Sequence, residues 1–109
     1  MRVDFLPEVV DFFEELVLIL HEEGYLGSYE FSKKYVNELI ESIKISLPVR
    51  RRLLAPKRFD KYGKGMKYAA FRKSKRTTWY VFFKTYKQNG EEIYLVRYIA
   101  NNHIIAQYL

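Results

Sequence analysis

The chain has 109 residues, 49% hydrophobic and 17% aromatic, so it carries enough apolar side chains for one modest core and is not disordered. It has no cysteine, which excludes a disulfide framework and a thiolate zinc site, and its two histidines, His21 and His103, argue against a histidine-built metal site. The longest aliphatic run, residues 16–20, is far too short to cross a bilayer, and no secretory signal opens the sequence. We therefore expect one cytoplasmic domain over residues 1–109, with no metal, no cofactor and no membrane association.

Charge is distributed unevenly along the chain. Residues 1–45 contain ten acidic and four basic side chains, whereas residues 46–109 contain fifteen basic and three acidic ones, so the two parts carry −6 and +12. Twelve of the bases fall between Arg50 and Arg76, with Asp60 the only acid among them. Charge repulsion of that density is typical of a protein with a polyanionic partner, so we expect a nucleic acid. A solvated basic face without a ligand is the alternative.

The first residues predict a short strand and a helix. Val3 and Phe5 alternate with charged neighbours over residues 1–6, as in a strand. Pro7 fits the first turn of a helix, where its missing N–H is not needed. Helical spacing of apolar residues then continues to Gly24, a typical helix stop. The apolar positions of this helix are Val9, Phe12, Phe13, Leu16, Val17 and Leu20.

A second helix is predicted after Ser28, whose side chain can cap its first turn. Pro48 disfavours helical geometry at Leu47, so we expect this helix to end near there. A glycine-containing loop over residues 24–27 joins the two helices as an antiparallel hairpin. The predicted buried stripe of the second helix consists of Phe31, Tyr35, Val36, Leu39, Ile40 and Ile43.

After Gly65 the hydrophobic period changes from helical to alternating. The segment before it, residues 49–65, contains Pro56, two glycines and much of the basic cluster, and it predicts a loop. Three segments rich in Tyr, Phe, Val, Thr and Trp then predict strands. The Asn89-Gly90 pair between the last two is typical of a type I′ hairpin turn. The predicted strands cover residues 66–72, 77–87 and 92–100, and a short tail or helix follows over 101–109.

The predicted order is β-α-α-β-β-β, which indicates an α+β fold whose helical hairpin covers one face of a three-stranded antiparallel meander. The strands carry a further pattern: one ends in an arginine, the next is rich in aromatic residues, and the last contains an arginine and is followed by a histidine. These segments read KYAAFR (67–72), TTWYVFF (77–83), IYLVRYI (93–99) and NNH (101–103). In element order and in these segments, the chain resembles the RelE/ParE superfamily of bacterial toxins.

The resemblance implies a toxin of a type II toxin–antitoxin system, neutralised by a cognate antitoxin protein. In the RelE, YoeB and HigB branches such toxins cut mRNA in the ribosomal A site, so the expected function is a ribosome-dependent, metal-independent mRNA endoribonuclease. The ParE branch instead inhibits DNA gyrase and lacks the nuclease residues. An inactive module that binds nucleic acid is the third alternative, and the sequence leaves all three open.

Metal-free RNA cleavage needs a base for the 2′-OH proton, cations for the pentacoordinate phosphorane, and an acid for the leaving 5′-oxygen. His103 is the acid–base candidate, because histidine titrates near neutrality and this one lies in the basic part of the chain. The resemblance also places a catalytic histidine directly after the last strand. Tyr108 would approach His103 if the tail is helical. A surface histidine without a catalytic role is the alternative.

Arg72 and Arg97 are the candidates for binding the reacting phosphate, since a guanidinium stays charged and binds phosphate oxygens through paired hydrogen bonds. The resemblance matches Arg72 with the phosphate-binding arginine of the second strand and Arg97 with the fourth-strand arginine of several branches. We expect the two arginines to be neighbours across the meander. By alternation, Arg97 shares a strand face with Ile93, Leu95 and Ile99, so it either pairs with a carboxylate or points into a functional cleft.

Contacts to the RNA backbone are expected from basic residues in the predicted loops. The Arg50-Arg51-Arg52 run is more typical of a solvated or antitoxin-facing patch. Tyrosines can stack on RNA bases, although we expect most of them within the sheet. Tyr98 follows Arg97, so it faces the opposite side of the strand unless a bulge intervenes. The predicted RNA-binding residues are Lys57, Arg58, Lys61, Lys64, Lys73 and Arg76.

Two features depart from the family pattern. The sequence Ala100-Asn101-Asn102-His103 stands where many active branches have a basic cluster. No glutamate lies within residues 46–66 to act as the general base of YoeB-like enzymes, and Asp60 is the only acid there. Cleavage by this chain would therefore depend more strongly on its lysines and on His103.

Overall fold

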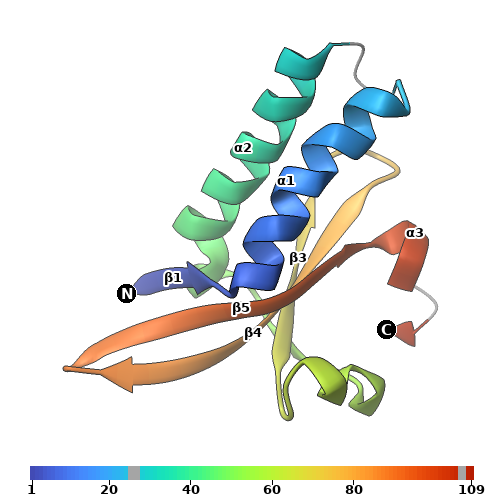
Figure 1. Cartoon of the computed structure of the whole chain (residues 1–109). Helices are drawn as coiled ribbons and strands as arrows, with labels where there is room; N and C mark the ends of the chain where they lie inside the picture. The colour runs from blue at the N-terminus through green and yellow to red at the C-terminus, as the bar shows by residue number, and fades with distance from the viewer. Residues whose placement is uncertain (25–27, 106–107) are drawn as a thin grey trace.

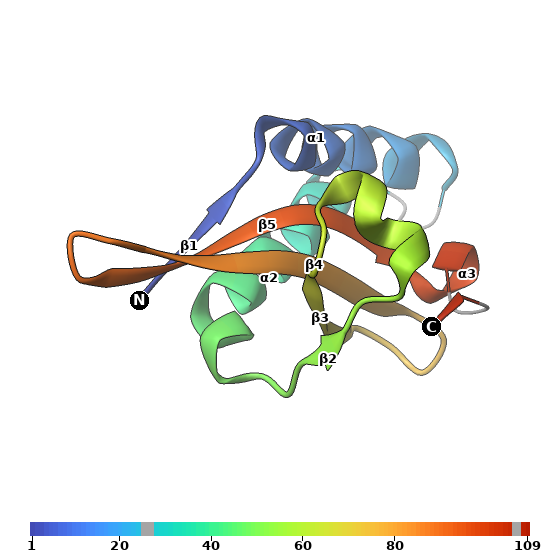
Figure 2. The ribbon, with the colours of Figure 1, turned by 90° about the horizontal axis from the view of Figure 1, so that it is seen from below.

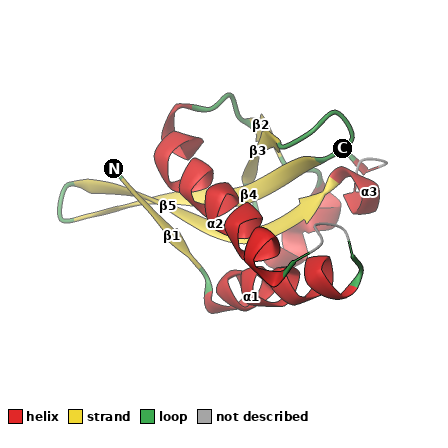
Figure 3. Cartoon of the chain, turned by 90° about the horizontal axis from the view of Figure 1, so that it is seen from above, coloured by secondary structure: helices red, strands yellow, loops and turns green. Residues whose placement is uncertain are grey.

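The strands form one mixed sheet, and two long helices cover one of its faces. The computed structural model describes residues 1–24, 28–105 and 108–109. The strand order is β1-β5-β4-β3-β2, with β1 parallel to β5 and the other neighbouring pairs antiparallel. The helices α1 and α2 lie side by side over this sheet (Figures 1 and 3). The elements are β1 (Arg2–Phe5), α1 (Pro7–Glu22), α2 (Tyr29–Ser46), the 3-10 helix η1 (Leu47–Val49), β2 (Leu53–Leu54), the 3-10 helix η2 (Lys57–Tyr62), β3 (Lys67–Arg72), β4 (Thr78–Gln88), β5 (Glu91–Asn101) and α3 (Asn102–Ile105).

The α+β class and the antiparallel β3-β4-β5 meander are confirmed, but the sheet is wider than the sequence predicts. The N-terminal strand adds to β5 at one edge, and β2 adds to β3 at the other. The predicted loop over residues 49–65 was wrong in part, because it contains β2 and η2. Two residues are too few for a strand to show a period, so β2 left no pattern to detect.

Both long helices begin where the sequence predicts. Pro7 is the first residue of α1, and Gly24, with φ of 71°, follows the end of that helix. The Ser28 hydroxyl accepts a hydrogen bond from the backbone N–H of Phe31 and so caps α2. Of the loop predicted over residues 24–27, all but Gly24 lies outside the described residues.

The buried stripe of α2 differs from the prediction at its first position. Phe31 is 63% exposed, whereas Ser32 is fully buried and donates a hydrogen bond to the Ser28 carbonyl. The stripe then continues through Val36 and Leu39 to Ile43, at spacings of four, three and four residues. Hydrophobicity favoured Phe31 over its polar neighbour, but the register of the helix turns Ser32 toward the core.

The main core lies between the helices and the sheet. It joins Phe13 and Leu16 of α1 and Leu39 of α2 to Val81 and Phe83 of β4, all buried. Burial of each large apolar side chain contributes about 1.5–3 kcal/mol, so this layer supplies most of the stability of the fold. Because side chains alternate along a strand, those between the core residues point to the other face of the sheet.

The opposite face of the sheet is covered by much less chain. Figure 2 shows η2 crossing it, with α3 and the C-terminal residues to one side. Phe59 of η2 packs on Phe82, with ring centroids 4.6 Å apart, and Ile105 of α3 joins the same small cluster. In η2, Phe59 and Tyr62 recur after three residues, the spacing that puts two side chains of a 3-10 helix on one side.

The β4–β5 hairpin extends beyond the helices as a long arm (Figure 1). Gln88 pairs with Glu91, which leaves Asn89 and Gly90 as a two-residue turn. Their φ angles of 52° and 79° are both positive, as a type I′ turn requires, so the predicted turn is confirmed.

A β-bulge in β5 sits at Arg97. Val96 pairs with Phe83 and Tyr98 pairs with Phe82, which leaves Arg97 as an extra residue on β5. The bulge lies just after β1 ends, where the Leu6 N–H donates to the Val96 carbonyl. Beyond this point the outer edge of β5 has no partner strand among the described residues.

The bulge corrects the predicted orientation of Ile99. Val96, before the bulge, and Ile99, after it, both belong to the core under the helices. Residues 93 and 95 therefore face away from the helices, and Ile99 does not share their side. The prediction that Ile99 shares one strand face with Ile93, Leu95 and Arg97 was wrong, because an extra residue resets the alternation before Ile99.

Candidate nucleic-acid interface

The ten predicted site residues lie in two groups. The first group surrounds η2 and is called here the η2 group; the second surrounds the turn between β3 and β4 and is called the turn group. The η2 group contains Lys57, Arg58, Lys61, Lys64, Arg97 and Tyr108, and the turn group contains Arg72, Lys73, Arg76 and His103.

The η2 helix has one basic and one aromatic side. Lys57, Arg58 and Lys61 are exposed, whereas Phe59 is buried against the sheet. Lys64 is exposed directly after the helix. Four cations on about two turns of chain make a local positive surface suited to phosphates.

The side chain of Arg97 is hydrogen-bonded to the backbone of η2. Its Nε donates a hydrogen bond of 2.6 Å to the carbonyl of Tyr62, the last residue of η2. No carboxylate of the described residues forms an ion pair with it, although Glu8 lines the same cavity between α1, η2 and β5. Of the two alternatives from the sequence, the cavity is thus the one that the geometry supports.

Tyr98 lies beside the η2 group because of the bulge. Its ring stacks on Tyr62 with centroids 3.9 Å apart and planes 6° apart. Burial, together with the neighbouring Tyr62 hydroxyl, raises the pKa of Tyr98 to about 12. Its phenol is therefore protonated near neutral pH and does not act as a base there.

Tyr108 lies against η2 as well. The Arg58 guanidinium sits 3.7 Å above the centroid of the Tyr108 ring, a close cation–π contact. The expected approach of Tyr108 to His103 through a helical tail depends on residues 106–107, which lie outside the described residues. What the described residues show is that Tyr108 belongs with Arg58.

The turn group is organised by Asn102. Its side-chain oxygen accepts a hydrogen bond from the Thr78 N–H, and its amide nitrogen donates to the Arg76 carbonyl. These two bonds hold α3 against the β3–β4 turn, and they place the His103 Nε2 3.5 Å from the Thr77 hydroxyl oxygen. Asn102, which departs from the basic family pattern, thus has a structural role that nothing in the sequence signalled.

The two arginines expected to meet do not lie together. β4 lies between β3 and β5 in the sheet. Arg72 pairs with Thr78, the first residue of β4, next to the β3–β4 turn. Arg97 lies beside the Phe82–Phe83 step, about 15 Å farther along that strand. Arg72 donates from its Nε to the Ser74 carbonyl, so it belongs to the turn.

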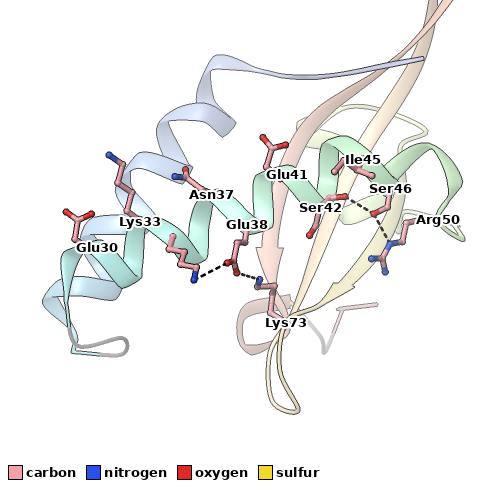
Figure 4. Close-up of a pocket in the computed structure, with 11 residues that line it drawn as sticks. Glu30, Lys33, Asn37, Glu38, Glu41, Ser42, Ile45, Ser46, Arg50 and Lys73 are labelled. Atoms are coloured by element: carbon pink, nitrogen blue, oxygen red, sulfur yellow. Dashed lines mark hydrogen bonds and ion pairs between the residues drawn. The ribbon is translucent and has the colours of Figure 1, made fainter.

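Lys73 is partly engaged by α2. Its Nζ lies 3.8 Å from a Glu38 carboxylate oxygen and 5.0 Å from the Tyr35 ring centroid, and its side chain is 19% exposed. Figure 4 shows Lys73 reaching Glu38 in a groove of about 850 Å³ along α2. The groove is lined by acidic and basic side chains alike, so it does not present one charge to a polyanion.

Two members of the Arg50-Arg51-Arg52 run contact aromatic rings of the sheet, although Arg50 remains exposed. The Arg50 guanidinium lies 4.2 Å from the Phe71 ring centroid and donates to the Ala70 carbonyl. The Arg52 guanidinium stacks over the rings of Phe83 and Tyr94 and donates to a nearby backbone carbonyl. Arg50 and Arg51 are exposed and Arg52 is partly buried, so a solvated or antitoxin-facing patch stays a prediction.

The electrostatics of the molecule separate by element. Most carboxylates lie exposed on α1 and α2, whereas the cations of both groups lie on η2, the β3–β4 turn and β5. In the described part of the chain, no group of three or more His, Cys, Asp or Glu side chains could hold a metal ion. The described helices also include none long and apolar enough to span a bilayer.

The chain matches no protein-family model, and it matches neither a curated protein nor a solved structure.

Proposed function

We propose that this chain is the toxin of a cytoplasmic type II toxin–antitoxin system and acts as a ribosome-dependent mRNA endoribonuclease. The η2 group carries the proposal. Four exposed cations on η2 and the residues after it adjoin the guanidinium of Arg97 and the tyrosines 62, 98 and 108. Cations bind the backbone of single-stranded RNA and aromatic rings stack on its bases, so this combination suits RNA without requiring a particular sequence.

The chemistry would follow metal-free cleavage. A base removes the 2′-OH proton, the 2′-oxygen attacks the adjacent phosphorus, and the bond to the 5′-oxygen breaks as an acid protonates that oxygen. The products are a 2′,3′-cyclic phosphate and a 5′-hydroxyl. Arg97 and the η2 lysines would stabilise the phosphorane, and His103 would move a proton. His103 is exposed in the turn group. Its imidazole can reach a bound RNA only if the RNA runs from the η2 group toward α3.

A ParE-like inhibitor of DNA gyrase is the second candidate, and one observation favours it. His103 lies in the turn group, whereas Arg97 and Tyr108 lie with η2, so the proton-transfer candidate and the best-placed phosphate ligand occupy different groups. A gyrase inhibitor needs binding surfaces but no acid–base pair. An inactive nucleic-acid-binding module would share the surface and lack toxicity.

Either toxin would be neutralised by a cognate antitoxin protein. The cations of the η2 group lack described carboxylate partners within ion-pair distance. An acidic or amphipathic antitoxin segment would complement them and cover the surface that binds the target.

Induced expression in a bacterial host separates the three candidates. Growth and mRNA 5′ ends are measured with the wild-type chain and with Arg97→Gln, His103→Ala and Lys33→Ala, the last as a surface control on α2. Growth arrest with new 5′ ends inside translated codons, lost in Arg97→Gln and His103→Ala but kept in Lys33→Ala, is the expected result. Arrest with intact mRNA would favour gyrase, and normal growth would contradict both toxin functions.

A further inference from the structure

A cavity of about 360 Å³ opens between α1, η2 and the bulged part of β5. Its walls are mostly apolar, from Leu6, Val9, Phe12 and Ile99, and the stacked Tyr62–Tyr98 pair closes one side. Arg97 is the charged group on its β5 wall, with Lys61 and Glu8 from the two helices beside it. A cavity of this size with apolar walls and few polar groups is typical of a small-molecule subsite.

Arg97 is held in one orientation in this cavity. The Tyr62 carbonyl accepts the hydrogen bond from Nε, which fixes the plane of the guanidinium. Gly63, the next residue, lets the chain pass close by: a β-carbon there would lie 2.7 Å from Arg97 Nε and 3.0 Å from Cδ. Its φ of 154° also lies in a region that side chains other than glycine rarely adopt.

The two terminal nitrogens of Arg97 remain accessible. Within the described chain they form no hydrogen bond or ion pair, and no fully buried side-chain nitrogen or oxygen lacks a partner. Each terminal nitrogen therefore keeps some exposed surface. A guanidinium whose Nε is already hydrogen-bonded can still donate two parallel hydrogen bonds to one anion from its terminal nitrogens. This paired donor is called the fork below.

We propose that this cavity binds one nucleotide of single-stranded RNA, with its phosphate on the terminal nitrogens of Arg97 and its base in the apolar part. The Tyr62 carbonyl and Gly63 are positioning elements that aim the guanidinium. This inference rests on the proposed action on RNA and names a subsite for it.

The mixed character of the cavity selects a nucleotide over a simple anion. Inorganic phosphate would use Arg97 and Lys61 but leave the apolar walls in water, and a nucleoside would use the walls but leave the fork empty. A nucleotide uses both parts, so its affinity should exceed that of either piece. The Glu8 carboxylate at the cavity offers an acceptor to the amino group of a base.

The test uses adenosine 5′-monophosphate, adenosine, inorganic phosphate and N-acetylphenylalanine as probes. Binding is followed by NMR through the methyl groups of Leu6, Val9 and Ile99 in the wild-type chain. The matched variants are Gly63→Ala and Gly65→Ala: both glycines have positive φ in the same loop, but a β-carbon at Gly65 would have nothing within 4 Å. Arg97→Gln and Arg97→Lys complete the series, since the lysine keeps the charge but not the fork.

We expect the monophosphate to shift these methyl resonances with at least about tenfold higher affinity than phosphate or adenosine, the scale of one charged hydrogen-bonded pair. Gly63→Ala, Arg97→Lys and Arg97→Gln should each lose about that factor, and Gly65→Ala should keep wild-type affinity. Circular dichroism identifies any variant that fails to fold, in which case the Arg97 variants decide the result.

Three results would overturn the inference: no methyl shift with the monophosphate, equal binding of phosphate alone, or stronger binding of N-acetylphenylalanine, which would indicate a protein side chain as occupant. Equal affinity of Gly63→Ala and Gly65→Ala would remove the positioning role. Failure of the proposed function looks different. There the monophosphate binds as expected, yet expression of the chain causes neither growth arrest nor new mRNA ends.

Discussion

The two faces of the sheet differ in what covers them. One face lies under two helices of sixteen and eighteen residues and forms the larger core. The other lies under a six-residue 3-10 helix, a four-residue helix and the end of the chain, with only a small cluster beneath. The acidic residues are concentrated over the first face and the η2 cations over the second. The difference teaches that one face of the sheet holds most of the buried core, whereas the other leaves a basic surface exposed around η2.

The largest expected effect is on the helix-covered face. Phe83→Ala removes a side chain that is 1% exposed within the larger core, so we expect a loss of about 3–5 kcal/mol in the free energy of unfolding. Urea denaturation measures it. Tyr86→Ala, three residues along the same strand but 43% exposed, is the control and should change stability by less than about 0.5 kcal/mol. Similar losses in the free energy of unfolding for both variants would contradict the claim that this core supplies most of the stability.

A substitution on the other face should have a more local effect. Phe59→Ala removes the side chain that anchors η2 on Phe82, with a cost near the lower end of the same range, about 3 kcal/mol, because a short helix can collapse into the space. Hydrogen exchange should speed up in η2 and remain slow in α1 and α2. The affinity of Phe59→Ala for RNA should also fall, because the η2 cations lose their fixed positions. Uniform loss of protection across the chain would show that the two faces are not separable.

The cap of α2 is a smaller contribution to the helix-covered face. Ser28→Ala removes the acceptor for the Phe31 N–H and should cost about 1 kcal/mol, whereas Ser28→Gly should cost only a few tenths. Thermal or urea unfolding of the three proteins makes the comparison. RNA affinity should not change in either variant, and a change would link α2 to the binding surface.

The last expected effect is confined to alkaline pH. The pKa of Tyr98 is raised to about 12 in the folded chain, against about 10 in an unfolded one, so the folded chain holds this proton more tightly. The stabilisation is therefore complete below pH 10 and is lost as the pH rises toward 12. In Tyr98→Phe the free energy of unfolding should fall less steeply over that interval. Parallel curves for the two proteins would show that Tyr98 titrates normally.

Much of the helix-covered face could be predicted from the sequence, because long elements carry periodic signals. The proline at position 7, the cap at Ser28 and the Asn89-Gly90 turn each act through local geometry, and the structure contains all three. Phe31 is the exception, since its exposure depends on the register of α2 against the sheet.

The face under η2 could be predicted less well, because its geometry depends on contacts distant in sequence. The η2 cations were found from charge alone, but the Arg97 bulge arises where β1 stops pairing with β5, and no local pattern marks that position. Asn102 bonds to a turn 24 to 26 residues away, and the carbonyl of Tyr62 lies 35 residues from Arg97. The sequence contained only a weak sign of the role of Gly63: a glycine directly after Phe59 and Tyr62, two aromatic residues spaced three apart.

The salt dependence of single-stranded RNA binding tests the division between the two faces most directly. The wild-type chain is compared with a triple alanine variant of Lys57, Lys61 and Lys64, and with a matched triple variant of Lys33, Lys34 and Lys44 on α2. Each phosphate contact contributes about 0.7 to the slope of log affinity against log salt, so the η2 variant should lose about 2 from the slope while the α2 variant keeps it. Equal losses in both variants, or none in either, would contradict the assignment of binding to the η2 face.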